Sequence, residues 1–102
     1  MVHVQVISRG DTNLQTAIRS AITEGAIKSF EISQVKGGLK IRHKKHLGEV
    51  RFVNTKGPLL ATLVCKNRSK EWQLLEAFVG RLVYHFKNEI AAINIQPEPD
   101  ES

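Results

Sequence analysis

Lysine and arginine side chains are concentrated in one stretch of this sequence, where they could bind anions. Residues 36–70 carry 10 of the chain's 15 Lys and Arg and a single acid, Glu49. Cationic side chains held on one surface bind the phosphates of nucleic acids and release their counterions. The residues that we expect to contact phosphate are Lys36, Lys40, Arg42, Lys44, Lys45, Arg51, Lys66, Arg68 and Lys70.

Two basic clusters within this stretch favour a binding surface. Strand alternation puts Lys40, Arg42 and Lys44 on one sheet face, about 7 Å apart along the strand, a spacing that resembles successive phosphates. Lys66, Arg68 and Lys70 open a second amphipathic segment, and the free N–H groups and dipole of a helix N-terminus also favour an anion. We therefore expect a nucleic-acid-binding domain, RNA ahead of DNA, that contacts the phosphate backbone.

Two other interpretations of the basic stretch stay open. The cations could belong to a solvated sheet face that only keeps the protein in solution and protects an edge strand. They could also form the basic face of a regulatory module that binds an acidic protein. The net charge of +5 favours a polyanion only weakly, and the local distribution of the charge says more than the total.

Aromatic residues give little sign of base reading. Tyr84 lies off the apolar stripe and is expected on the surface. The aromatic residues that fall on apolar stripes, and are expected in the core, are Phe30, Phe52, Trp72, Phe78 and Phe86. Without a stacking platform, phosphate contact is better supported than recognition of bases.

The sequence holds no strong set of catalytic or metal-binding residues. His43 and His46 lie three apart, so they point to opposite faces of an extended strand, and Cys65 is distant from both. Structural zinc needs four good ligands, so we expect no metal and no cofactor. A nucleophile elbow and a phosphate-binding glycine loop are also missing, and we expect that the protein is not an enzyme.

Length and composition indicate one small domain. A chain of 102 residues with one cysteine has room for one core and no disulfide framework, which favours a reducing, cytoplasmic compartment. No apolar run approaches the ~20 residues that cross a bilayer, so we expect no membrane association. Residues 1–96 are expected to form the domain. Residues 97–102, which are acidic and contain two prolines, are expected to be a disordered tail.

The hydrophobic pattern predicts an α+β fold. Alternation at residues 2–7, 30–33, 39–44 and 50–53 indicates strands, and residues 54–58 indicate a turn. Residues 59–65 are apolar on both faces, which indicates a central strand or one covered on both faces. Helical spacing indicates helices at 14–22, after a capping box at 12–15, and from Ser69, the expected N-cap, to Ile90. Ile93 and Ile95 either extend the second helix or form a final short strand. We expect a two-layer sandwich, an antiparallel sheet of about four strands with both helices on one face, in the order β-α-β-β-β-α.

Two sets of apolar residues complete these expectations. The core residues are expected to be Leu14, Ile18, Ile22, Phe52, Leu75, Val79 and Leu82. Val53, Leu60 and Val64 lie on the sheet face opposite that core, where an apolar patch is a candidate homodimer interface. The alternative is that these three are scattered surface residues.

Overall fold

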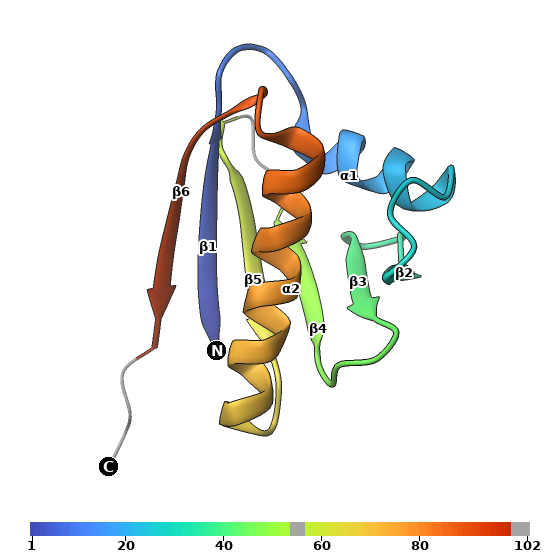
Figure 1. The fold of residues 1–102 in the computed structure, drawn as a ribbon, viewed down its shortest axis with the longest axis vertical. Coiled ribbons are helices and arrows are strands. Elements are labelled where there is room, and N and C mark those ends of the chain that lie inside the picture. The colour runs from blue at the N-terminus through green and yellow to red at the C-terminus, as the bar shows by residue number, and fades with distance from the viewer. Residues whose placement is uncertain (54–56, 99–102) are drawn as a thin grey trace.

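The computed structural model describes residues 1–53 and 57–98, in which two helices cover one face of a single antiparallel sheet (Figure 1). The elements in chain order are β1 (Val2–Ser8), α1 (Leu14–Thr23), β2 (Phe30–Gln34), β3 (Lys40–His43), β4 (Glu49–Val53), β5 (Leu59–Val64), α2 (Arg68–Phe86) and β6 (Ile90–Pro97). The centre of the predicted turn, 54–56, and most of the predicted tail, 99–102, lie outside the described residues.

The predicted α+β class and antiparallel sheet are confirmed, but the strand count of about four is wrong, because the sheet has six strands in the order β2-β3-β4-β5-β1-β6. Four strands, rather than three, separate the helices. β6 pairs with β1 from Val2–Pro97 to Ser8–Ile90, so Ile93 and Ile95 belong to a strand and not to the helix. Without β6, the N–H and C=O groups of β1 that point away from β5 would be unpaired.

The two helices begin at asparagine caps. The side chain of Asn13 accepts a hydrogen bond from the N–H of Thr16 at the start of α1, inside the predicted capping segment. The side chain of Asn67 accepts from the N–H groups of Ser69 and Lys70 at the start of α2. The predicted N-cap Ser69 is therefore wrong. Asn67 has the extended backbone that a cap requires, whereas Ser69 is already inside the helix.

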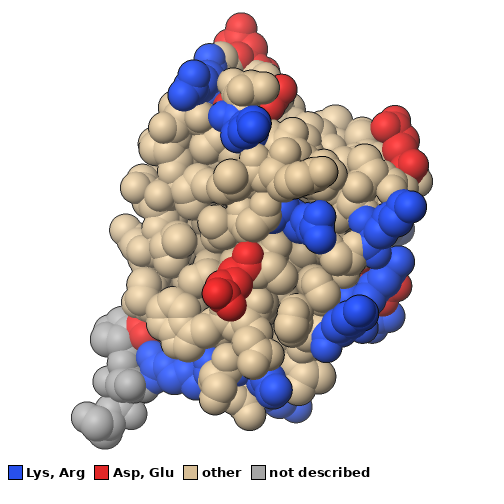
Figure 2. All heavy atoms as spheres, in the orientation of Figure 1, with Lys and Arg blue, Asp and Glu red and all other residues tan. Residues whose placement is uncertain are grey.

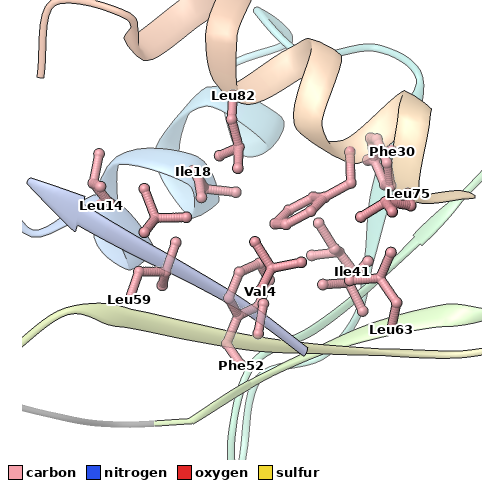
Figure 3. Packing of buried hydrophobic residues seen from close by; sticks show 14 of the residues in the cluster. Val4, Leu14, Ile18, Phe30, Ile41, Phe52, Leu59, Leu63, Leu75 and Leu82 are labelled. Atoms are coloured by element: carbon pink, nitrogen blue, oxygen red, sulfur yellow. The ribbon is translucent and has the colours of Figure 1, made fainter. Parts of the chain in front are cut away.

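One core joins the sheet to both helices (Figure 3). Of the predicted core residues, Ile22 and Val79 are partly buried against this core, and the fully buried ones are Leu14, Ile18, Phe52, Leu75 and Leu82. Leu74 is fully buried, whereas Trp72 is 47% exposed, so its predicted burial is wrong. Each helical residue turns by about 100°, which puts Trp72 about 120° from Phe78 at the centre of the buried stripe.

Candidate nucleic-acid interface

A close contact at Gly48 brings two basic segments to one end of the sheet. Gly48 has φ +101°, and a Cβ there would lie 2.6 Å from the carbonyl oxygen of Val64 and 3.0 Å from Cys65 Cβ. Only glycine tolerates both this backbone and this approach. The turn between β3 and β4 therefore packs on the junction between β5 and α2. We call the exposed cations of these two segments the end cluster: Lys44, Lys45, Lys66, Arg68 and Lys70.

The end cluster is continued along one edge of the molecule. The N–H of Lys44 donates to the carbonyl oxygen of Ser29 at 2.9 Å, which places the exposed Lys28 beside the cluster. Figure 2 shows Lys and Arg along the side of the molecule that carries β2 and β3 and at the end where α2 begins. Sequence reasoning missed Lys28, because it precedes the basic stretch by eight positions and reaches it only through strand pairing.

Two carboxylates border the end cluster. Glu71, in the first turn of α2, is buried, and its carboxylate lies 3.4 Å from the amino group of Met1. Glu98 receives hydrogen bonds on two atoms. Arg68 donates to the main-chain carbonyl oxygen of Glu98 at 3.0 Å, and the carboxylate Oε1 of Glu98 lies 3.0 Å from His3 Nε2. The hydrogen bond with His3 is the main reason that the pKa of Glu98 is lowered.

Part of the predicted acidic tail is thus placed by contacts. Pro97 is the last residue of β6, opposite Val2, and the N–H of Glu98 donates to the carbonyl oxygen of Met1 at 3.0 Å. The end of β6 therefore lies beside the start of α2, at the same end of the molecule as the end cluster (Figure 1).

Three other predicted cations lie on the open face, which is the sheet face opposite the helices. Lys40 and Arg51 are direct cross-strand partners there. The guanidinium of Arg42 lies 2.6 Å from the carboxylate of Glu31, and that of Arg51 lies 2.6 Å from the carboxylate of Glu49. Two of these three cations are therefore paired with carboxylates.

The predicted site residues thus divide into three groups. Lys40, Arg42 and Arg51 lie on the open face, and Lys36 lies in the turn that precedes β3, at the opposite end of that strand from Lys44. The remaining five make up the end cluster. Lys44 does not continue the row of Lys40 and Arg42, because β3 ends at His43 and the chain turns there.

Exposed aromatic side chains lie on α2 rather than on the open face. Tyr84 is 74% exposed, as predicted, and Trp72 is the second exposed aromatic of that helix. Within the described part of the chain, the residues that alternate onto the open face include no Phe, Tyr or Trp. The open face therefore offers no platform on which bases could stack.

His43, the last residue of β3, and His46, in the turn that follows, lie close together. Their rings lie 4.4 Å apart, because the chain bends after His43. His43 Nδ1 accepts hydrogen bonds from the N–H groups of Lys45 and His46 at 3.0 and 3.2 Å, so this nitrogen is occupied by the turn. Burial, reinforced by His46, Arg81 and Lys45, lowers the pKa of His43. Among residues 1–53 and 57–98, no group of three His, Cys, Asp or Glu is placed to hold a metal ion.

Two surface hollows lie away from the end cluster. One of about 1060 Å³ lies between the loop after β1 and the start of β5, and one of about 350 Å³ lies on the open face around His3 and Leu60. Neither has a Lys or Arg among its described lining residues. They therefore do not extend the cationic surface.

Comparison of the chain with protein-family models, with curated proteins and with solved structures found no match. Within the described residues, no helix is both long and apolar enough to span a bilayer.

Proposed function

We propose that this protein binds nucleic acid, RNA ahead of DNA, through phosphate contacts made by the end cluster. The observation that carries the proposal is the meeting of two basic segments, 44–45 and 66–70, at the N-terminus of α2. Cations on a helix's first turn and on an adjoining turn present several donors to one phosphate run, and the helix dipole adds to their field. Lys28 extends this surface along the neighbouring edge.

The open face has a secondary role in this proposal. Arg42 and Arg51 are engaged by Glu31 and Glu49, so a phosphate must compete with a carboxylate for each guanidinium. Exposed ion pairs contribute only up to about 1 kcal/mol, so this competition weakens binding there without preventing it. Since phosphates carry no base identity and the open face lacks a stacking platform, sequence preference should be weak.

Titration of labelled RNA and of duplex DNA at several salt concentrations tests the proposal, with heparin as a generic polyanion. About five phosphate contacts predict a log–log salt slope near −4.5 on duplex DNA and a shallower slope on single strands. Lys45→Gln combined with Lys66→Gln removes one cation from each segment. It should flatten the duplex slope by about 1.8 and weaken binding to all sequences alike.

The matched control is Arg19→Gln combined with Lys87→Gln, two exposed cations on α1 and just after α2. An equal loss in the control would mean that only net charge matters, and the end cluster would not be the site. Binding of heparin without binding of either nucleic acid would favour the acidic-protein partner instead.

A further inference from the structure

The outer edge of β6 is weakly protected: only Pro97 at its end and a register shift against β1 near its start interrupt it. β6 is eight residues long and contains no charged residue, and no described strand pairs with its outer side. The opposite edge strand, β2, is shorter and carries a charge. It has five residues, carries Glu31 and is interrupted by a register shift between Ile32 and Gln34. Natural sheets shorten, charge or kink free edges because an unprotected edge pairs with another chain.

The register shows which main-chain groups of β6 face outward. The N–H of Glu98 donates to Met1, so Glu98 directs its main-chain groups toward β1, and the alternation of an antiparallel pair extends this to Gln96 and Asn94. Ile93 and Ile95 therefore direct their N–H and C=O groups away from the sheet. Pro97 shares their orientation and lacks an N–H, which is where an edge strand tolerates proline.

An apolar surface lies beside this edge, on the side of the helices. Ile95 pairs with the core residue Val4 but is 41% exposed, since α2 does not reach over it. On α2, Trp72 and Val83 are each 47% exposed. They lie on the flank of the helix opposite Arg81.

That flank of α2 faces β6. Arg81 lines a small hollow together with Phe30 of β2 and Ile41 of β3, so its own flank is turned toward those strands. The sheet order puts β3 and β6 on opposite sides of β5 and β1, and α2 lies between them in Figure 1. The corresponding area of Figure 2, between α2 and the outer edge of β6, is mostly free of charged side chains.

We propose that β6 is a homodimer interface, in which the outer edge of β6 pairs antiparallel with the β6 of a second copy. Antiparallel pairing of a strand with itself is compatible with a two-fold axis, so one surface serves both partners. The interface would join two six-stranded sheets into one and bring Trp72 and Val83 of the two α2 helices toward each other.

A second copy is the occupant that the charge distribution favours. The chain is basic overall, yet β6 is uncharged, so like charges do not oppose each other when the strand pairs with itself. The cations of the end cluster lie in the β3–β4 turn, at the junction between β5 and α2, and on the first turn of α2, and none of them belongs to β6. This interface is distinct from the open-face patch of Val53, Leu60 and Val64, which stays a competing prediction.

Sedimentation of the full chain over a range of concentrations, from low micromolar to millimolar, tests the proposal. The wild-type protein should approach twice the monomer mass. Ile95→Lys places a charge on the edge and should raise the dimer dissociation constant at least tenfold, about 1.4 kcal/mol. Leu60→Lys is the matched control, because Leu60 is a strand residue of similar exposure, 37%, on the open face, and this variant should still dimerise.

Trp72→Gln gives a second variant that leaves β6 intact, and circular dichroism checks that each variant is folded. A wild-type monomer at millimolar concentration, or a dimer that survives both Ile95→Lys and Trp72→Gln, would overturn the proposal. Loss of the dimer on Leu60→Lys but not on Ile95→Lys would assign the interface to the open face. Hydrogen exchange of the Ile93 and Ile95 amides should slow as concentration rises, and an unchanged rate would count against pairing at β6.

Discussion

Gly48 lies against Val64 so closely that a Cβ at position 48 would be 2.6 Å from the Val64 carbonyl oxygen. This contact joins the β3–β4 turn to the strand that leads into α2, and it holds the two halves of the end cluster at one end of the sheet. Gly48→Ala should lower the free energy of unfolding by about 1–3 kcal/mol, because the side chain meets backbone and the φ of +101° strains any residue with a Cβ.

Urea denaturation measures this cost, with Gly10→Ala as the control. An added Cβ at Gly10 meets nothing within 4 Å. Its substitution should change stability by no more than about 1 kcal/mol, in the stabilising direction if the backbone there suits alanine. If Gly48→Ala were as harmless as Gly10→Ala, the close packing of the two basic segments would be wrong.

Leu82 anchors α2 to the core and is 2% exposed. Leu82→Ala should destabilise the protein by about 2–5 kcal/mol, through lost burial and the cavity left behind. Leu47→Ala, at a side chain that is 63% exposed, should change stability by less than about 0.5 kcal/mol. The unfolding midpoints of both variants, taken at one protein concentration, decide whether α2 presents this face to the sheet.

Asn67 rather than Ser69 should control the stability of the α2 N-terminus. Asn67→Ala removes the acceptor for two main-chain N–H groups and should cost about 0.5–2 kcal/mol. Ser69→Ala should cost less, since Ser69 is inside the helix and alanine favours helix. If Ser69→Ala lowered the free energy of unfolding more than Asn67→Ala, Ser69 would be the N-cap, as the sequence predicted.

The lowered pKa of His43 should make stability depend on pH. Since its pKa is below 6.5 in the folded protein, the unfolded chain binds the proton more readily. The contribution of neutral His43 is complete above pH 6.5 and is lost as the pH falls through the lowered folded pKa. Protonation at Nδ1 would also break the two hydrogen bonds from the turn.

Two measurements check this dependence on pH. His43→Gln should reduce the fall in urea midpoint below pH 6.5. In an NMR titration, His46→Gln should raise the pKa of His43 only part of the way toward 6.5, because burial, the largest cause of the lowering, is still present. A His43 that titrates at or above 6.5 in the wild-type protein would contradict the burial of its ring.

The candidate site shows where local pattern stops being informative. The basic character of residues 36–70 is visible in the sequence, but its division into an end cluster and an open face is not. Arg42 meets Glu31 through the register of β2 and β3, and Arg51 meets Glu49, two residues earlier on the same face of β4, through the rotamers of the two side chains. Lys28 lies beside the end cluster because Ser29 and Lys44 share a main-chain hydrogen bond, and no sequence motif predicts this bond.

Local sequence pattern was enough to predict the elements whose periodicity is strong, such as β1 with Val2, Val4 and Val6, and α1 with Leu14 and Ile18. Periodicity reports which side chains share a face of their own element, because that depends only on local backbone geometry. The position of β1 between β5 and β6, and the burial of Leu74 in place of Trp72 on α2, became visible only in the folded protein. These outcomes depend on contacts between residues far apart in the chain, whose cost in loop closure and gain in burial are balanced only in the complete fold.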